Sequence, residues 1–305
     1  MKVLVATEKP FAKIAVDGIR KVVEEAGYQL ALLEKYTEKS QLLEAVADAD
    51  ALIVRSDKAT AEVIEAGKKL KIIVRAGAGY DNIDLPAATS KGIVVMNTPG
   101  QNSNAVAELA LGMMVFMARG QFKGISGTEL KDKKLGIHAY GYVGKAVATI
   151  AKGFGMEIYA FDPFISDDVM IKDGIKPVHS AEELYQTCHY VSLHIPANEK
   201  TKKSIHYELL KLMPKGATLV NTARKEVICE DSLKKIFAER DDFKYISDIA
   251  PDCHQDLVQY EPRYYATPKK QGAETAEANI NAGIAAAKQI VAFFKNGDKT
   301  FQVNK

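Results

Sequence analysis

The residues from Ala139 to Gly144 have the types and spacing of a turn that binds a dinucleotide cofactor. They read AYGYVG, which is the GxGxxG pattern with alanine in the place of its first glycine. Gly141 leaves no side chain where a pyrophosphate would approach the backbone, and Gly144 allows the following helix to pack closely on the strand. Free amides at the start of that helix, and the positive end of its dipole, attract phosphates. We therefore expect contacts with the cofactor from Gly141, Tyr142, Val143 and Gly144.

Asp162 lies roughly 20 residues beyond this turn, at the distance of an acid that binds the adenine ribose. A carboxylate there accepts hydrogen bonds from both ribose hydroxyls and repels a 2′-phosphate, so NAD is favoured over NADP. The glycines can also serve only to make a turn, because a single degraded GxGxxG pattern is weak evidence. The apolar run Leu135–Ala139 before the turn and the helical spacing of Lys145–Phe154 after it favour cofactor binding.

The elements that would carry this turn alternate between strand and helix. In the first third of the chain, short apolar runs predict strands, and segments with helical spacing separate them. Such alternation is typical of a parallel sheet covered by helices on both faces. The expected strands are Val3–Ala6, Gln29–Leu33, Leu52–Val54, Lys71–Val74 and Ile93–Met96, and the expected helices are Pro10–Ala26, Ser40–Ala47, Thr60–Ala66 and Leu85–Ser90.

The alternation breaks at Asn97–Gly100, where one long helix is expected over Asn102–Arg119. That helix is apolar on most faces, so it is either buried or partly an oligomer surface. A last helix over about Thr275–Phe294 is expected to return the tail to the first domain. A second series of strands is expected at Glu157–Phe161, Tyr190–Ile195, Ala217–Asn221, Tyr245–Ile249 and Tyr264–Thr267.

Composition narrows the classes of function. The 305 residues include 41 basic and 39 acidic side chains, so no broad positive charge favours nucleic acid. No apolar run is long enough to span a bilayer, and the amino terminus has no signal-peptide layout. The three cysteines are odd in number and widely spaced, which suits a reducing cytoplasm. Cysteines and histidines form no metal-ligand pattern.

Four segments resemble the D-2-hydroxyacid dehydrogenase family, and most closely a short D-3-phosphoglycerate dehydrogenase without a regulatory carboxyl-terminal domain. The resemblance covers nearly the whole chain together with the glycine turn. NTP followed by an AEL helix, and NTARKE, are its specific signals. The segments are Val74–Met114, Tyr190–Ile205, Leu219–Leu233 and Gly272–Gly283.

The resemblance implies an α/β fold of two doubly wound parallel-sheet domains. A Rossmann NAD-binding domain is expected over residues 99–284, inserted in a flavodoxin-like substrate domain of residues 1–98 and 285–305. Hydride transfer is expected in the cleft between the two. It also implies a homodimer built mainly through the cofactor domains, with the helix over Asn102–Arg119 at or near the interface.

The resemblance also assigns roles to single residues. Arg224 matches the catalytic arginine, whose guanidinium can fork onto a carboxylate. Asp248 matches an acid that holds the nicotinamide carboxamide, although an aspartate there can equally cap a turn. The remaining positions that match the cofactor pocket are His194, Ile195, Pro196, Thr201, Thr222 and Ala223.

The chain departs from the family where a catalytic histidine is usual. Thr267-Pro268-Lys269 places a lysine at that position, and Cys253, beside Asp252, stands at the spacing of the histidine's acidic partner. A Glu-Pro pair occurs only later, at Glu261. Our hypothesis is that Lys269 acts as general acid and base, provided that burial or nearby cations lower its pKa. The alternatives are that it binds substrate phosphate or is a solvated loop residue.

Substrate identity depends on two basic loops at expected strand ends. By resemblance, contact with the substrate is expected from Arg55, Ser56, Arg75, Gly77 and Ala78. Arg55 and Arg75, with Lys58, can bind a phosphate. The leading interpretation is NAD-dependent oxidation of D-3-phosphoglycerate to 3-phosphohydroxypyruvate, the entry to serine synthesis. The alternatives are a dehydrogenase of another D-2-hydroxy acid or glyoxylate, and a catalytically silent NAD-sensing protein.

Overall fold

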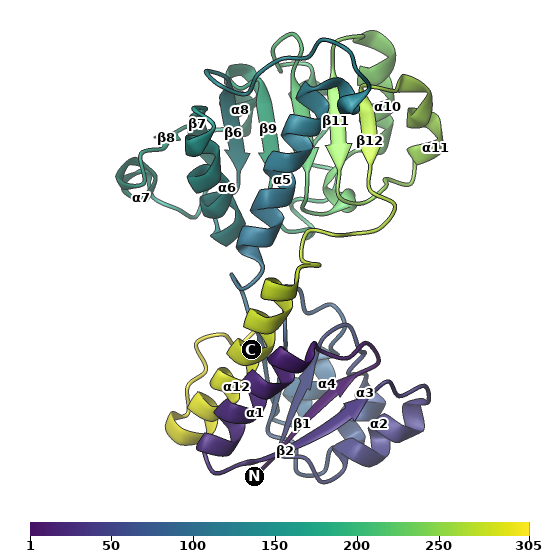
Figure 1. Ribbon diagram of the computed structural model, residues 1–305, viewed down its shortest axis with the longest axis vertical. Coiled ribbons are helices and arrows are strands. Elements are labelled where there is room, and N and C mark those ends of the chain that lie inside the picture. Colours follow the sequence, from purple (N-terminus) through teal and green to yellow (C-terminus); the bar gives the residue numbers. More distant parts are fainter. Residues whose placement is uncertain (305) are drawn as a thin grey trace. The chain divides into compact units, whose positions relative to one another are not determined.

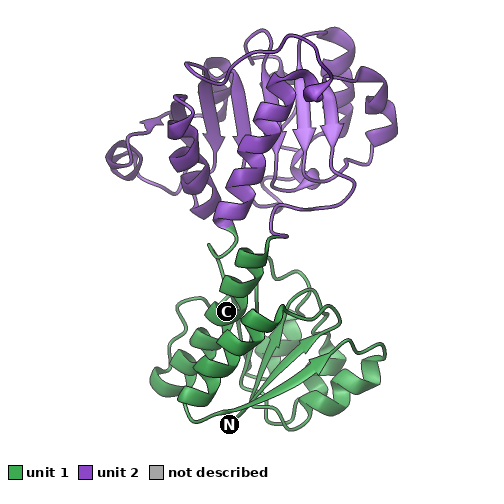
Figure 2. Ribbon diagram, in the orientation of Figure 1, with its two compact units in different colours: residues 1–102, 275–305 green, residues 103–274 purple. Residues whose placement is uncertain are grey.

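The computed structural model describes residues 1–304, which divide into two compact units. Unit 1 comprises Met1–Asn102 and Thr275–Lys305, and unit 2 comprises Ser103–Glu274; Figure 2 colours them separately. The boundaries expected from the sequence were 98/99 and 284/285. The second division falls earlier because the closing helix packs into the core of unit 1 soon after it begins: Ala282 lies in that core, and Ile280 packs against it.

Unit 1 is built on a parallel sheet of five strands in the order β2-β1-β3-β4-β5. This is the flavodoxin-like order, as expected. Its strands are β1 (Lys2–Thr7), β2 (Gln29–Glu34), β3 (Ala51–Val54), β4 (Ile72–Arg75) and β5 (Val94–Asn97), and its helices are α1 (Lys13–Glu25), α2 (Lys39–Val46), α3 (Ala61–Ala66), α4 (Leu85–Ser90) and α12 (Ala276–Asn296).

Both faces of this sheet are buried. Along β1, Val3 and Val5 pack into one hydrophobic cluster with α1 and α12, whereas Leu4 and Ala6 pack into another on the opposite face. Consecutive side chains of a strand point to opposite faces, so two-sided covering requires an unbroken apolar run. The run VLVA in β1 meets this requirement. The helices that cover unit 1 can be followed in Figure 1.

Unit 2 contains a parallel sheet of seven strands in the order β12-β11-β10-β9-β6-β7-β8. From β8 to β11 this is the Rossmann order, with the topological switch point between β6 and β9. The strands are β6 (Lys134–His138), β7 (Glu157–Phe161), β8 (Lys176–Pro177), β9 (Tyr190–Leu193), β10 (Thr218–Asn221), β11 (Lys244–Ser247) and β12 (Tyr264–Ala266).

Helices cover both faces of the unit 2 sheet. Helix α5 lies against α6 and the strands β10 and β11 (Figure 1). The methionines Met113, Met114 and Met117 of α5 are buried in the same cluster as Leu135 and Ile137 of β6. The helices are α5 (Ser103–Ala118), α6 (Tyr142–Gly153), α7 (Asp167–Lys172), α8 (Ala181–Thr187), α9 (Tyr207–Leu210), α10 (Glu230–Glu239) and α11 (His254–Leu257), with 3₁₀ turns η1 (Gly120–Phe122), η2 (Lys225–Val227) and η3 (Val258–Tyr260).

The two-domain doubly wound architecture expected from the sequence is confirmed. None of the helices in residues 1–304 is both long and apolar enough to cross a bilayer.

Candidate active site

The expected cofactor residues of unit 2 follow the carboxyl ends of its strands. The glycine turn follows β6, Asp162 follows β7, His194 follows β9, Thr222 follows β10 and Asp248 follows β11. All these strands are parallel, so their carboxyl ends share one edge of the sheet. The fold therefore gathers most of the expected cofactor residues along one edge.

The glycine turn has the geometry of a phosphate site. Gly141 is the N-cap of α6, and no side chain caps that helix. A Cβ added to Gly141 would have no heavy atom within 4 Å, whereas one on Gly144 would lie 2.4 Å from the carbonyl oxygen of Ala139. Gly144 is thus required by packing. No protein contact requires Gly141, and uncapped helix amides beside an open backbone suit a pyrophosphate.

Ala139 occupies the position of the missing first glycine with a positive φ of 81°. This region of φ is costly for a residue with a Cβ, by about 1–2 kcal/mol. The neighbouring contacts hold the turn nevertheless. The amide of Tyr140 donates to Asp162 Oδ2 at 2.8 Å, and the Tyr140 hydroxyl donates to Asp173 Oδ2 at 3.1 Å.

Asp162 has acceptor capacity left for a ligand. Besides the bond from Tyr140, its Oδ1 accepts the amide of Phe164 at 2.9 Å. Each carboxylate oxygen therefore receives one backbone N–H and retains a further lone pair. The side chain is half-buried directly after β7, and the hydrogen bond from the Tyr140 amide ties it to the glycine turn. This arrangement fits the ribose-binding role expected from the sequence.

Two neutral histidines lie at the ends of β6 and β9. Burial lowers the pKa of His138 to about 4 and the pKa of His194 to about 3. The Nε2 of His194 lies 3.0 Å from the Ser192 hydroxyl, and the Nδ1 of His138 lies 3.4 Å from the Tyr185 hydroxyl. Both rings are therefore uncharged near neutral pH. Sequence reasoning did not single out His138, because its position inside an apolar strand resembled a core position.

The segment after β9 forms a compact turn. Ile195 is buried and Pro196 is exposed. The Thr201 hydroxyl donates to the Pro196 carbonyl and accepts the amide of Asn198 at 2.9 Å. Thr201 therefore fixes the shape of this loop at the expected cofactor edge.

The turn after β10 presents the arginine of the NTAR motif. Asn221 holds it, because its Oδ1 accepts the amide of Ala223 and its Nδ2 donates to the carbonyl of Arg224, both at 3.0 Å. The Thr222 hydroxyl is buried without a hydrogen-bond partner in residues 1–304. An orphaned buried hydroxyl is costly, and a cofactor at this edge would supply a partner.

Arg224 is half-buried and is not neutralised by any carboxylate in the described chain. Its Nη1 donates to the carbonyl of Ala223 at 2.9 Å. The Nζ of Lys270 donates to the same carbonyl at 3.3 Å. Two cationic side chains thus converge on one backbone oxygen. Lys270 was missed at sequence level, although it is the neighbour of the lysine that we singled out.

Asp248 anchors the loop that carries both lysines. Its carboxylate is 1% exposed and accepts the amides of Gln271 and Gly272, each at 2.8 Å, and the hydroxyl of Thr267 at 3.3 Å. A Cβ on Gly272 would lie 2.9 Å from this carboxylate, so the close approach requires glycine. The geometry thus gives Asp248 the turn-holding role that the sequence left open, and contact with a cofactor stays a prediction.

Lys269 is exposed on this loop, so unit 2 by itself does not provide the burial that our hypothesis invoked. Among residues 1–304 no carboxylate forms an ion pair with it. Asp252 pairs with Lys225, and Glu261 lies 2.5 Å from the amine of Lys123. Cys253 is buried, and that burial raises the pKa of its thiol to about 12. The residue at the spacing expected of an acidic partner is therefore an uncharged thiol.

In unit 1, the expected substrate residues lie at the carboxyl ends of the neighbouring strands β3 and β4. The Nε of Arg75 donates to the carbonyl of Arg55 at 2.9 Å. A Cβ on Gly77 would lie 1.6 Å from Nη1 of Arg75, so glycine is required for this arginine's position. Ser56 and Ala78 are exposed beside them. The two arginines therefore form one basic site at the edge of the sheet.

Comparison with known proteins identifies the family to which this architecture belongs. The family model described as "D-isomer specific 2-hydroxyacid dehydrogenase, catalytic domain" matches residues 8–304. The chain belongs to the D-isomer specific 2-hydroxyacid dehydrogenase family. A solved structure of cofactor (NAD+) bound 3-phosphoglycerate dehydrogenase from Entamoeba histolytica is 53% identical with a TM-score of 0.89, covering 100% of this chain and 99% of that one.

Two further relatives of this chain are named for different enzymes. D-3-phosphoglycerate dehydrogenase of Methanocaldococcus jannaschii is 39% identical over 290 residues, covering 88% of this chain and 54% of that protein. Hydroxypyruvate reductase of Thermotoga maritima is 36% identical over 282 residues, covering 86% of this chain and 90% of that protein. The chain thus spans about half the length of the first relative and nearly all of the second.

Proposed function

We propose that the chain is an NAD-dependent dehydrogenase that oxidises D-3-phosphoglycerate to 3-phosphohydroxypyruvate, the first step of serine biosynthesis. The single observation that supports this substrate is the pairing of Arg55 and Arg75 at the ends of β3 and β4, where Nε of Arg75 donates to the Arg55 carbonyl at 2.9 Å. A plain aliphatic hydroxy acid has only one carboxylate and needs no such second basic site, whereas a phosphate does. The 53% identical phosphoglycerate dehydrogenase supports the same substrate.

NAD fits the residues of unit 2. The open backbone at Gly141, the spare lone pairs of Asp162 and the unpartnered hydroxyl of Thr222 are the groups that would hold it. His194, Ile195, Pro196 and Thr201 shape the adjoining edge, with Tyr142 and Val143 in the first turn of α6 and Ala223 beside Thr222. When bound, NAD+ supplies the acceptor for the hydride from C2 of the substrate.

Arg224 and Lys269 are the proposed catalytic residues. The guanidinium of Arg224 binds the substrate carboxylate and polarises the adjacent oxygen. The Nζ of Lys269 takes the proton from the C2 hydroxyl in oxidation and returns it in reduction. Lys270 is the alternative candidate for this proton transfer. Its Nζ donates to the carbonyl of Ala223, in the turn that also carries Arg224.

Substrate phosphate is proposed to bind at the basic site of unit 1. Arg55 and Arg75 supply charged donors, and Ser56 supplies a hydroxyl. Gly77 and Ala78 lie two and three residues after Arg75. The Gly77 amide already donates to the Arg75 carbonyl at 2.9 Å, so it is the Ala78 amide that can be offered to the substrate carboxylate. We propose that these five residues determine which substrate the protein selects.

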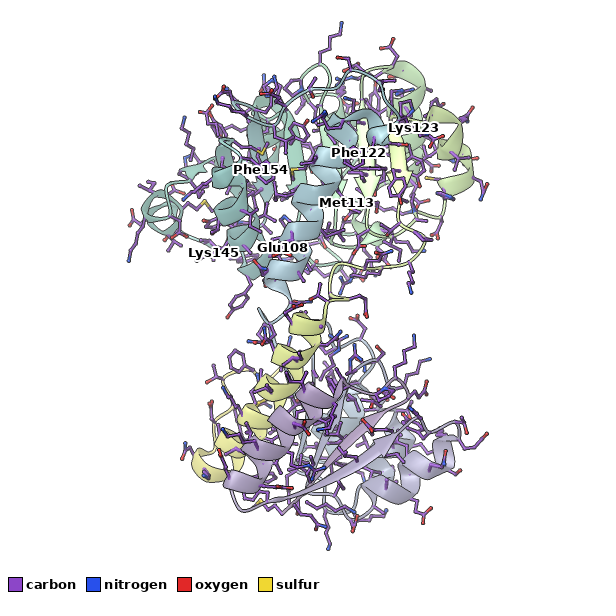
Figure 3. The ribbon with its side chains drawn as sticks, viewed as in Figure 1. Glu108, Met113, Phe122, Lys123, Lys145 and Phe154 are labelled. Carbon is purple, nitrogen blue, oxygen red and sulfur yellow. The ribbon has the colours of Figure 1, made fainter. Side chains whose placement is uncertain are left out.

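A homodimer is proposed to form through unit 2. Large apolar side chains are exposed in the segment that follows α5 and at the end of α6. Phe122 is 66% exposed and Ile125 is 55% exposed, and Phe154, the C-cap of α6, is 41% exposed. Figure 3 shows Phe122 and Lys123 after α5, with Met113 on that helix and Lys145 and Phe154 on or next to α6. Sedimentation of Phe122→Glu tests this, since loss of a dimer is expected and an unchanged mass would argue against it.

The three free thiols support a reducing, cytoplasmic setting.

The substrate is tested by NADH formation with D-3-phosphoglycerate, D-lactate and D-glycerate in parallel. Turnover with phosphoglycerate far above the others is expected. Preference for another acid would select the second candidate activity, and NAD binding without turnover would select a silent NAD-binding protein.

The proton-transfer residue is tested by the pH–rate profiles of Lys269→Ala and Lys270→Ala. For oxidation of D-3-phosphoglycerate, loss of the acidic limb of kcat is expected only in Lys269→Ala, because a protonated amine cannot take the proton. Loss only in Lys270→Ala would move the role to its neighbour, and unchanged hydride transfer in both variants would eliminate a lysine acid/base.

A further inference from the structure

The guanidinium of Arg55 is held by two segments of unit 1 that are distant in sequence. Its Nη2 donates to Oδ1 of Asn279 in the first turns of α12, and its Nη1 donates to the carbonyl of Lys9 at 3.5 Å. The Phe11 ring lies under it, with 5.2 Å between the guanidinium carbon and the ring centroid. A guanidinium has five N–H donors, so this side chain is oriented and still has donors for a ligand.

Asn279 is itself fixed by the start of its helix. Thr275 caps α12, with its hydroxyl accepting the amide of Ala278 at 3.1 Å. The Nδ2 of Asn279 donates to the carbonyl of Thr275 at 2.9 Å. Because the amino group of the Asn279 amide is used there, its oxygen is the atom that faces Arg55. Asn279 is half-buried and thus acts as a rigid neutral acceptor.

The neutrality of this acceptor matters for the charge at the site. Arg55 and Arg75 are tied together through the Arg55 carbonyl. A carboxylate at position 279 would hold the guanidinium equally well but would cancel one positive charge. An amide orients the guanidinium by a hydrogen bond and leaves the full charge for an incoming dianion.

We propose that Asn279 is a positioning residue that sets the selectivity of this enzyme for a phosphorylated over an unphosphorylated 2-oxo or 2-hydroxy acid. The inference rests on the proposed function, because it assumes that Arg55 binds the substrate phosphate. Asn279 acts through Arg55 and needs no contact with substrate. Its loss therefore affects recognition of the phosphate and leaves hydride transfer and cofactor binding intact.

The test compares NADH-dependent reduction of 3-phosphohydroxypyruvate with that of hydroxypyruvate, which differ only in the phosphate. Asn279→Leu removes the acceptor, and Asn279→Asp keeps the shape but adds a negative charge. Asn281→Leu is the matched control, since Asn281 is exposed on the same helix. Thermal unfolding and NADH affinity of each variant report whether its fold is intact.

In Asn279→Leu, kcat/KM for phosphohydroxypyruvate is expected to fall roughly tenfold, as for the loss of one hydrogen bond to a charged group. The change should lie in KM, with kcat and the hydroxypyruvate kinetics within twofold of wild type. Asn279→Asp should lose at least as much, because its carboxylate neutralises Arg55. Asn281→Leu should match wild type.

An equal loss for both substrates would assign Asn279 a merely structural role and overturn the inference. So would phosphohydroxypyruvate kinetics within twofold of wild type in either variant at position 279. A wild-type enzyme without any preference for the phosphorylated substrate would instead refute the proposed substrate itself. The two failures are therefore distinguishable in one set of rates.

Discussion

Replacing Gly141 by alanine is expected to weaken NAD binding without harming the fold. The added Cβ meets no heavy atom within 4 Å, and the φ of −80° is allowed for alanine. Alanine is a clearly poorer N-cap than glycine, but it also restricts the unfolded chain. These two effects oppose each other, so the free energy of unfolding should change by only about 0.5 kcal/mol. The methyl group instead occupies the space through which a pyrophosphate approaches the helix amides.

The expected loss of affinity follows from those amides. Lengthening one hydrogen bond to a charged group beyond its useful range costs about 1.5–3 kcal/mol. That corresponds to a roughly ten- to hundredfold increase in Kd. Titration calorimetry with NAD measures it directly, and thermal unfolding of the cofactor-free protein measures the fold.

Gly144→Ala is the contrasting variant. Its Cβ would lie 2.4 Å from the Ala139 carbonyl and 3.0 Å from Cγ2 of Ile137, so backbone must move. Such overpacking costs about 1–3 kcal/mol, and each kcal/mol lowers the midpoint by about 2–4 °C in a unit of this size. Equal NAD affinity of Gly141→Ala and wild type, or an unshifted midpoint in Gly144→Ala, would refute the division of labour between the two glycines.

Three further changes have defined outcomes. Asp162→Asn should lower the ratio of kcat/KM for NAD over NADP by about tenfold, because the charge that repels a 2′-phosphate is gone; initial rates with both cofactors decide. The folded-state pKa values of His138 and His194, about 4 and about 3, lie below the ordinary 6.5. The free energy of unfolding should therefore be full above pH 6.5 and fall on acidification by up to about 1.4 kcal/mol per pH unit for each ring. Urea unfolding at several pH values measures it, and an equally steep fall with pH in His194→Asn would contradict this. Hydrogen bonds from Arg240 lower the pKa of Asp242 to about 2, so Asp242→Asn should cost about 2 kcal/mol at pH 7, with the difference vanishing between about pH 4 and pH 2; a constant difference would exclude the ion pair as its source.

The sheet architecture could be predicted because its signals are local and repeated. Uniformly apolar runs such as Ile72–Val74 in β4 can exist only where both faces of a strand are buried. Short elements without such a signal were not foreseen: β8 has two residues, and α9 and α11 have four each. Their positions are set by tertiary packing rather than by periodicity.

Site residues were predicted where a motif surrounds them and missed where only a distant contact identifies them. Gly144 follows from the helix turn, and the structure shows the close approach that requires it. Asn279 bonds to Arg55 across 224 residues of sequence, a distance that no local pattern reports. Ala139 stands in the place of the pattern's first glycine, and only the structure shows that it takes a positive φ beside a turn that the Tyr140–Asp162 hydrogen bond holds.

Hydride transfer from C2 of phosphoglycerate is the central claim, and isotope tracing tests it most directly. The enzyme is incubated with NAD+ and D-3-phosphoglycerate that carries deuterium at C2, and the reduced cofactor is analysed by mass spectrometry. We expect reduced cofactor that contains one deuterium, formed in equal amount with 3-phosphohydroxypyruvate. Unlabelled NADH, or no reduction of NAD+ by this substrate, would contradict the account.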